Sequence, residues 1–135
     1  MELIKVVIRY ADGRVVKGHT RDFFPNKSSF HLEVIFGDSE GKAIEVQLND
    51  LKAVFFVRDF MGNPSYNERK YFTEGQQLSG RKVYVSFKDG EVLVGSTIGY
   101  DPKRNGFFLF PADPQSNNLK VFTVMSAVSK IDFLQ

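Results

Sequence analysis

The sequence has 135 residues, 42% of them hydrophobic and 25% charged, so wholesale disorder is excluded and one average or two small globular domains are expected. The net charge is only +2, with nine basic and nine acidic side chains in residues 1–60 and nine basic and seven acidic in residues 61–135, which argues against a domain built mainly to bind nucleic acid. Cysteine is absent, which excludes disulfides, zinc–thiolate sites, iron–sulfur clusters and thiolate nucleophiles.

The N-terminal segment gives an expectation about location. Residues 1–10 carry Glu2, Lys5 and Arg9 and contain no apolar run long enough for a signal peptide or a membrane span. Together with the absence of cysteine, this predicts a cytoplasmic protein that does not associate with membranes.

Residues 1–60 are predicted to form five short strands. Apolar and polar residues alternate over 6–10, which is the period of a half-buried strand, and no segment sustains a 3.6-residue apolar period. Asp12-Gly13 predicts a hairpin turn, and Gly18 predicts a bulge or a bend within the second strand. The later strands are expected at 30–36, 44–48 and 54–60, with a loop at 37–41 and a short turn at 49–52.

Residues 61–80 contain Gly, Asn, Pro and Ser and few apolar side chains, so they are predicted to form a linker. The following strands are expected from Lys82, with later strands at 107–110, 119–124 and 128–134. This order repeats that of the first sixty residues.

The repeat has a constant offset of 77 residues from Lys5 to Leu32. Ten positions are identical between the two stretches: Lys5, Val6, Asp12, Gly13, Val15, Gly18, Thr20, Pro25, Phe30 and Leu32. Convergent hairpins share turns and alternation, but not Pro, Phe and Leu at one fixed offset, so the pattern indicates an internal duplication. Beyond a loop expected to differ in length, the run 51–54 is taken to correspond to 125–128. We therefore predict an all-β protein with two five-strand units, residues 1–60 and 81–135, joined by a linker of residues 61–80.

This succession of strands and glycines resembles the SH3-like barrel of Sm and Sm-like proteins. Residues 85–101, followed by Asn105, are similar to the first Sm signature. The whole chain also resembles an uncharacterised bacterial family of tandem SH3-like barrels, sometimes found beside signalling domains, through the runs 21–25, 54–60 and 106–111. The resemblance implies two tandem five-strand SH3-like (Sm-like) barrels and implies no activity.

The sequence departs from the Sm pattern where Sm proteins bind RNA. The Arg-Gly pair of the second signature is missing from residues 122–127, and Lys103 stands where Sm proteins place a base-stacking aromatic residue. In the first half, Phe24 and Ser28 replace Asp101 and Asn105. The resemblance thus supports the fold more than it supports RNA binding.

A small basic cluster in the loop at residues 100–106 is a candidate contact for nucleic acid or another anion. Lys103 and Arg104 can neutralise phosphate, and Asn105 can read a base edge. Asp101 occupies the position of the Sm aspartate, and Lys27 is the counterpart of Arg104 in the first half. A solvated turn is the alternative for this loop, and the same two alternatives hold for the pairs 69–70 and 81–82.

Two pairs of adjacent phenylalanines predict a contact surface. Neighbouring residues on a strand point to opposite faces, so in a single barrel one ring of Phe23-Phe24 and one of Phe55-Phe56 should face outward. Phe24 and Phe56 are therefore candidates for a barrel–barrel or subunit interface. The alternative is that the linker covers the outward rings.

No constellation of residues predicts catalysis, a metal or a cofactor. His19 and His31 are the only histidines, and their repeat counterparts are Ser96 and Phe108, so structural roles are expected for them. Asp12 and Asp89 are expected to form turns, and no nucleophile elbow or phosphate-binding loop is present. We therefore do not expect an enzyme.

The predicted function is a non-catalytic interaction or assembly module that binds a protein partner or self-associates, in keeping with bacterial signalling. The alternative is an Sm-like RNA-binding protein. Five-strand units of this kind leave open edges at strands four and five, and one junction between such edges is expected to form within the chain. The outer edges would then be residues 44–48 and 128–134, or the reverse pair. Self-association through these edges and a monomer with edges covered by the linker are both open.

Overall fold

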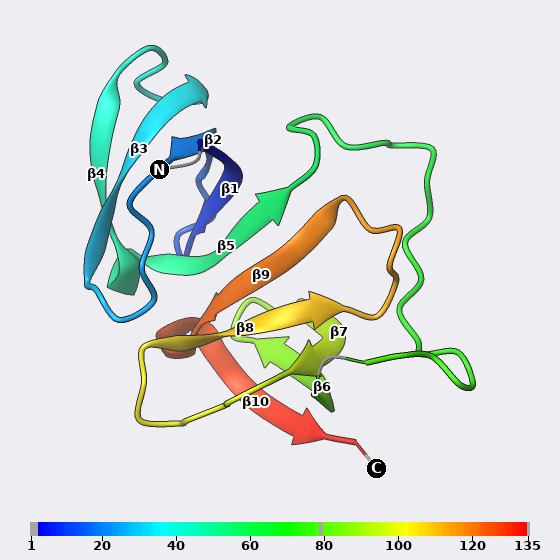
Figure 1. Ribbon diagram of the computed structural model, residues 1–135. Helices are drawn as coiled ribbons and strands as arrows, with labels where there is room; N and C mark the ends of the chain where they lie inside the picture. The colour runs from blue at the N-terminus through cyan, green and yellow to red at the C-terminus, as the bar shows by residue number, and fades with distance from the viewer. Residues whose placement is uncertain (1–2, 79, 135) are drawn as a thin grey trace.

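In the computed structural model, residues 3–78 and 80–134 are described, and their ten antiparallel strands form one continuous, open sheet (Figure 1). Residues 1–2, 79 and 135, which fall in the predicted first unit, linker and second unit, lie outside the described part. The helical elements of the described part are two 3-10 turns of three residues each, and none of them has the length and hydrophobicity that a membrane span requires. The all-β prediction is confirmed.

The first half of the sheet comprises strands β1 to β5. Its elements are β1 (Ile4–Tyr10), β2 (Val15–Thr20), β3 (Ser29–Phe36), β4 (Ala43–Gln47), the 3-10 turn η1 (Leu48–Asp50) and β5 (Leu51–Val57). Their order across the sheet is β5-β1-β2-β3-β4. Strand five was expected to reach Phe60, but it ends at Val57, where the chain leaves the sheet.

The second half has the same succession of elements. They are β6 (Arg81–Phe87), β7 (Val92–Thr97), β8 (Gly106–Pro111), β9 (Asn118–Val124), the 3-10 turn η2 (Met125–Ala127) and β10 (Val128–Phe133). Their order across the sheet is β10-β6-β7-β8-β9, which matches the order of the first half.

The offset of 77 residues holds through the last strand of each half. Val6 pairs with Phe56 in the first half, and Val83 pairs with Phe133 in the second. The prediction that residues 51–54 correspond to 125–128 is therefore wrong, because the strand register equates Leu51 with Val128. Residues 51–54 lie in strand β5, whereas residues 125–127 form the 3-10 turn η2, so their similar sequences occupy different elements. The loop that was expected to differ in length between the two halves shows no net difference.

A glycine within the second strand of each half allows that strand to bend against its neighbour. A Cβ atom on Gly18 would lie 2.2 Å from the carbonyl oxygen of Glu33, and one on Gly95 would lie 2.1 Å from that of Phe110. The pairing register of β2 with β3 shifts between Lys17 and Gly18. The predicted irregularity is confirmed at Gly18, and in both halves the close approach of two backbones explains why the position is glycine.

The two halves join edge to edge through β5 and β9. These strands pair antiparallel, with Val54 opposite Phe122 and Phe55 opposite Val121, and they lie side by side at the centre of Figure 1. Strand five of the first half thus meets strand four of the second, so one junction forms within the chain, as expected. The ten strands consequently form one open sheet, and two separate closed barrels are not seen.

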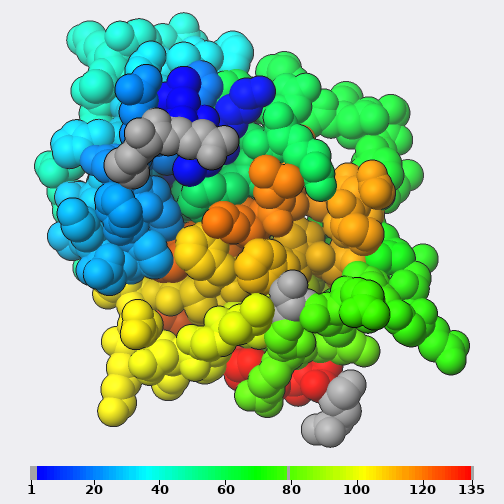
Figure 2. Space-filling view, viewed as in Figure 1, coloured from blue at the N-terminus to red at the C-terminus, as the bar shows by residue number. Residues whose placement is uncertain are grey.

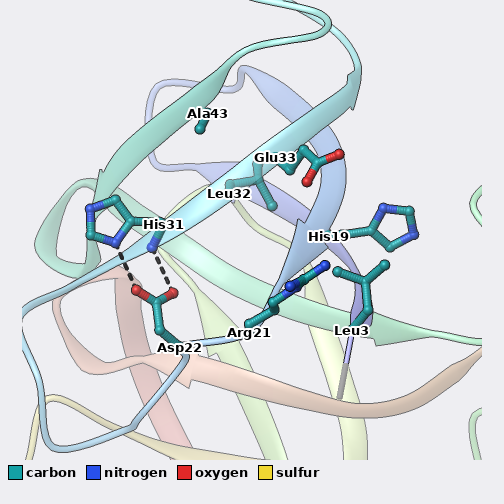
Figure 3. A pocket seen from close by; sticks show the side chains of 8 residues that line it. All are labelled: Leu3, His19, Arg21, Asp22, His31, Leu32, Glu33 and Ala43. Atoms are coloured by element: carbon teal, nitrogen blue, oxygen red, sulfur yellow. Dashed lines mark hydrogen bonds and ion pairs between the residues drawn. The ribbon is translucent and has the colours of Figure 1, made fainter. Parts of the chain in front are cut away.

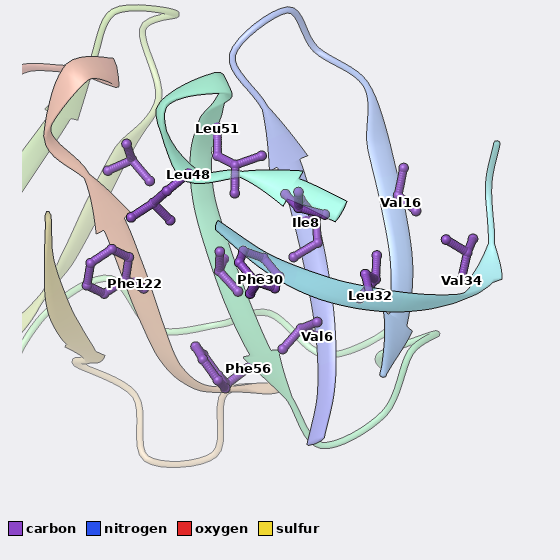
Figure 4. Packing of buried hydrophobic residues seen from close by; sticks show 13 residues of the cluster. Val6, Ile8, Val16, Phe30, Leu32, Val34, Leu48, Leu51, Phe56 and Phe122 are labelled. Carbon is purple, nitrogen blue, oxygen red and sulfur yellow. The ribbon is translucent and has the colours of Figure 1, made fainter. Parts of the chain in front are cut away.

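Each half contributes side chains to the core of the other. Phe122 and Val124 of β9 enter the first core, where Phe122 belongs to the same cluster as Phe56 and Phe30 (Figure 4). Conversely, Phe55 and other residues on the same face of β5 enter the second core, whose members are Ala53, Phe55, Val57, Val83, Val85, Phe87, Leu93, Phe107, Leu109, Val121 and Ala127. All seven residues of β5 are buried, because the strand has a hydrophobic core on each face.

The outer edges of the sheet are β4 and β10, the first of the two pairs expected from the sequence. On the face that would meet another chain, these two edge strands carry polar residues at positions where β9 and β5 carry apolar ones. Glu45 and Gln47 on β4 stand where β9 has Phe122 and Val124, and Lys130 and Asp132 on β10 stand where β5 has Ala53 and Phe55. Charged side chains on an edge strand disfavour pairing with another chain.

The segment after β5 docks on the loop between β8 and β9 through a polar network. The buried carboxylate of Asp113 accepts hydrogen bonds from the Tyr66 hydroxyl and the Arg69 backbone N–H. Burial opposes ionisation of Asp113, but these hydrogen bonds outweigh it and hold its pKa below the ordinary value. The Gln76 side chain donates to the carbonyl of Ala112. Residues 58–76 therefore form an attached strap.

Candidate functional site

A groove of about 350 Å³ lies between the outer face of the first half, the start of the strap and strand β7 of the second half. Apolar residues form its floor, and polar and basic residues converge on it from β1, β2 and the strap. The lining residues are Val7, Arg9, Val15, Lys17, Phe55, Val57, Phe60, Met61, Gly62, Lys70, Glu91, Leu93, Asn117 and Asn118. An apolar concavity with a few converging polar groups is the usual composition of a binding site.

The floor of the groove is held by the junction between the halves. Phe55 enters the second core with 6% exposure, and the guanidinium of Arg9 lies 5.2 Å from the centre of its ring. Because β1 pairs with β5 on one side and with β2 on the other, Arg9 is held between the junction and the exposed hairpin. The groove exists only when both halves are joined.

Phe60 anchors the strap onto the outer face of the first half. Its ring makes edge-on contacts with His19 at 5.3 Å and with Phe36 at 5.9 Å. Its carbonyl oxygen accepts a hydrogen bond of 2.8 Å from the Lys17 ammonium group. These contacts place Lys17 and the exposed Met61 at the rim of the groove.

A buried lysine links the halves beside this groove. The ammonium group of Lys52 on β5 lies 2.6 Å from Asp89 and also pairs with Glu91, and its side chain is only 7% exposed. The hydrogen bond from Lys52 lowers the pKa of Asp89. Glu91 lines the groove, but its carboxylate is already engaged by Lys52.

Two other hollows contain polar groups that pair within the chain. One, of about 410 Å³, contains the ion pair of His31 and Asp22 at 2.7 Å together with Arg21, Glu33 and His19 (Figure 3). The other, of about 530 Å³, lies between the strap and the β8–β9 loop. The strap and the loop hydrogen-bond to each other there, as in the contacts between Asn117 and Asp59.

The predicted binding residues of the second half lie together in the loop between β7 and β8. This loop, yellow in Figure 2, projects from the surface at the lower left. Asp101 closes it as a turn, because its carboxylate accepts the Lys103 backbone N–H at 2.9 Å, and it lies 3.8 Å from the Arg104 guanidinium. Lys103, Arg104 and Asn105 are exposed, so both the solvated turn and an anion contact are compatible with this geometry.

The predicted residues of the first half divide between surface and interior. Phe24 is 39% exposed, and the Lys27 ammonium group lies 5.1 Å from the centre of its ring. Phe56 is 4% exposed and packs in the first core, so the prediction that it belongs to a binding surface is corrected. Its ring contacts Phe23 of the first half and Phe108 of the second half. The neighbouring ring, Phe55, points to the opposite face of β5 and lies in the second core.

The histidines and turn aspartates have the structural surroundings that were expected. His31 is exposed and paired with Asp22, and His19 packs on Phe60. Asp12 and Asp89 accept the backbone N–H two residues further on, as turn-forming aspartates do. Within residues 3–78 and 80–134, no group of three or more His, Asp or Glu side chains is arranged to hold a metal ion.

The basic residues of the groove were missed by the sequence analysis. Their signal lies in a comparison of the halves, because Arg9 and Lys17 correspond to Ser86 and Val94 at the offset of 77. The second half has the same strand order without charged side chains at these two positions, so the strand order does not depend on them. That comparison shows that Arg9 and Lys17 are not among the residues that the two halves share, whereas both line the groove.

Comparisons with known proteins give a family but no activity. The sequence profile of a family of unknown function, DUF6982, matches residues 3–135. Searches of curated proteins and of solved structures found no significant match.

Proposed function

We propose, for a chain that belongs to the DUF6982 family of unknown function, that it binds a protein partner without catalysis in the groove between its halves. The groove is the observation that carries this proposal. It combines an apolar floor with basic side chains on a framework fixed by the β5–β9 junction. A concave site that is already formed before binding lowers the ordering cost of binding.

We also propose that each half is an SH3-like barrel of the Sm type and that the two arose by duplication. Three features support this: the shared strand order, the strand-bending glycines Gly18 and Gly95, and the constant offset of 77 residues. In this interpretation, β5 and β9 form the kind of junction that Sm proteins make between subunits.

Binding of a partner is favoured over self-association through the outer edges. If β4 of one chain paired with β10 of another as β9 pairs with β5, Lys130 and Asp132 would enter one core and Glu45 the other. Burying these charges without oppositely charged or hydrogen-bonding partners costs free energy and so opposes association. The outer edges therefore favour a chain that stays single.

Binding of a protein is also favoured over binding of RNA at the β7–β8 loop. Stacking of bases requires exposed aromatic faces. The ring of Phe23 packs edge-on against those of Phe56 and Phe122. Among the predicted residues only Phe24 offers an exposed ring, and Lys27 lies over it.

Peptide selection on the immobilised protein tests the proposal. Peptides selected from a random twelve-residue library should lose about tenfold or more in recovery on a Val15→Gln/Met61→Gln variant, because two exposed apolar residues of the groove are removed. The matched control is Val92→Gln/Ile98→Gln. Val92 is the counterpart of Val15 and equally exposed, and neither Val92 nor Ile98 lines the groove. Equal recovery on both variants would contradict the proposal.

A further inference from the structure

We propose that the partner presents an extended acidic segment to the groove, with carboxylates that pair with Arg9, Lys17 and Lys70. This inference names the chemistry of the partner, and it rests on the proposed function. It is argued from charge, from the spacing of the basic side chains and from the nature of the floor.

The charge of the groove is positive. In the part of the chain that the structure describes, Arg9, Lys17 and Lys70 line it together with one carboxylate, Glu91, which is already paired with Lys52. Within the described residues, Arg9 and Lys17 form no ion pair, and Lys70 pairs with the half-buried Glu68 at 3.3 Å. Lys17 uses one N–H for the Phe60 carbonyl, which leaves two donors for a ligand. An anionic ligand would therefore balance a charge that the chain itself leaves open.

The charge is specific to this groove and is not a property of the repeated strands. The same face of the second half carries Ser86, Val94 and Ser96 where the first half carries Arg9, Lys17 and His19. Because the second half has the same strand order without them, the strand topology does not require these basic side chains. Arg9 and Lys17 line the groove between the halves, which points to recognition.

The spacing of the basic side chains fits an extended segment. Lys17 lies opposite Val7, and Val15 lies opposite Arg9, so Arg9 and Lys17 are diagonal neighbours on one face of the β1–β2 hairpin. Such neighbours are roughly 7–8 Å apart. Alternate side chains of an extended peptide are separated by about 7 Å, so acidic residues at alternate positions match the pair. The intervening side chains would face the apolar floor or solvent.

The floor favours a peptide over a single-stranded nucleic acid. Its exposed apolar groups are aliphatic, such as Val15 and Met61. Of the two rings in its described lining, Phe55 lies under Arg9, and Phe60 is partly covered by His19 and Phe36. Nucleic-acid strands bind basic grooves through stacking on open rings. Aliphatic side chains accept apolar peptide side chains instead.

Three phage-displayed libraries test the inference. Their twelve-residue peptides carry Glu, Gln or Lys at four alternating positions and random residues elsewhere. We expect about tenfold higher recovery from the Glu library than from the Gln library, and the lowest recovery from the Lys library, because exposed ion pairs with Arg9 and Lys17 favour acidic peptides and repel basic ones. An Arg9→Gln/Lys17→Gln variant should lose this preference. The control Lys103→Gln/Arg104→Gln, which removes equal charge from an exposed loop, should keep it.

The outcomes separate this inference from the proposed function. Equal recovery from the Glu and Gln libraries, with peptides still lost on Val15→Gln/Met61→Gln, would overturn the acidic partner and leave the groove as the binding site. If no peptide depends on Val15 and Met61, both ideas are overturned. If a twelve-nucleotide oligo-uridine displaces the peptides and depends on Arg9 and Lys17, the groove binds nucleic acid and the peptide assignment is wrong.

Discussion

Phe55 and Phe56 are neighbours in the sequence, yet their side chains lie in different hydrophobic cores. Phe56 packs near Phe122 in the first core, and Phe55 packs with Val121 in the second. Alternation along a strand places adjacent side chains on opposite faces, and β5 has a core on each face. Both cores therefore contain residues from both halves, which makes the halves mutually dependent.

The first prediction concerns this dependence. A Phe55→Ala variant should lose about 3–5 kcal/mol of unfolding free energy, because a large buried ring is removed from the second core. Since the cores share strands, the whole chain should still unfold in one transition. Urea denaturation followed by circular dichroism and by NMR signals of both halves measures this. The control Phe24→Ala, at an exposed ring, should cost about 1 kcal/mol or less. Two separate transitions would show that the halves fold independently.

The second prediction concerns the outer edges. The natural chain should have the mass of one chain in multi-angle light scattering at every concentration. Replacing the polar edge residues by their junction counterparts, with Glu45→Phe and Gln47→Val on β4 and Lys130→Ala and Asp132→Phe on β10, should produce oligomers. Each edge changed alone should remain less associated, because the junction needs both surfaces. A natural chain that already forms oligomers through β4 and β10 would contradict this explanation.

The third prediction concerns the bend in β2. Gly18→Ala should destabilise the protein by about 1–3 kcal/mol or more, because the new methyl group would lie 2.2 Å from the Glu33 carbonyl oxygen. Gly13→Ala is the matched control. Gly13 has a positive φ of 99° but no atom near the added methyl group, so its cost should be about 1 kcal/mol. Thermal unfolding of both variants measures the difference, and a smaller effect at Gly18 than at Gly13 would refute the close-approach argument.

The fourth prediction concerns the exposed pair of His31 and Asp22. The hydrogen bond and the charge of Asp22 raise the pKa of His31 above its ordinary value of 6.5. Because the pKa is raised in the folded state, the pair contributes to stability below pH 6.5, where His31 is protonated, and this contribution is lost as the pH rises through the folded pKa. It is also lost at acidic pH, when Asp22, whose pKa is lowered, becomes protonated. An NMR titration of the His31 ring should show a raised midpoint that falls in an Asp22→Asn variant. An unchanged midpoint in that variant would contradict the pairing.

The strands could be predicted from the sequence because their signals are local. Alternation located β1, and the Asp-Gly turns and mid-strand glycines located the hairpins and bends in both halves. The register of the last strand could not be predicted from local similarity, because a 3-10 turn and a strand have similar short sequences here. Pairing with β1 and β6 fixes that register through contacts distant in sequence.

The groove could not be predicted because its lining comes from segments that are far apart in the sequence. Arg9, Lys17 and Lys70 belong to two strands and the strap, and Leu93 comes from the other half. Phe56 was assigned outward on the assumption of a single barrel, whereas the junction covers both faces of β5. Contacts between the two halves, such as these, can be located only when the arrangement of the halves is known.

The most direct test of the account is an NMR titration of the ¹⁵N-labelled protein with the peptide that is best recovered from the Glu library. The account predicts chemical-shift changes concentrated at the groove, at Val7, Arg9, Lys17 and Leu93, with little change in the β7–β8 loop. Changes concentrated at Lys103, Arg104 and Lys27, with the groove signals unmoved, would contradict it.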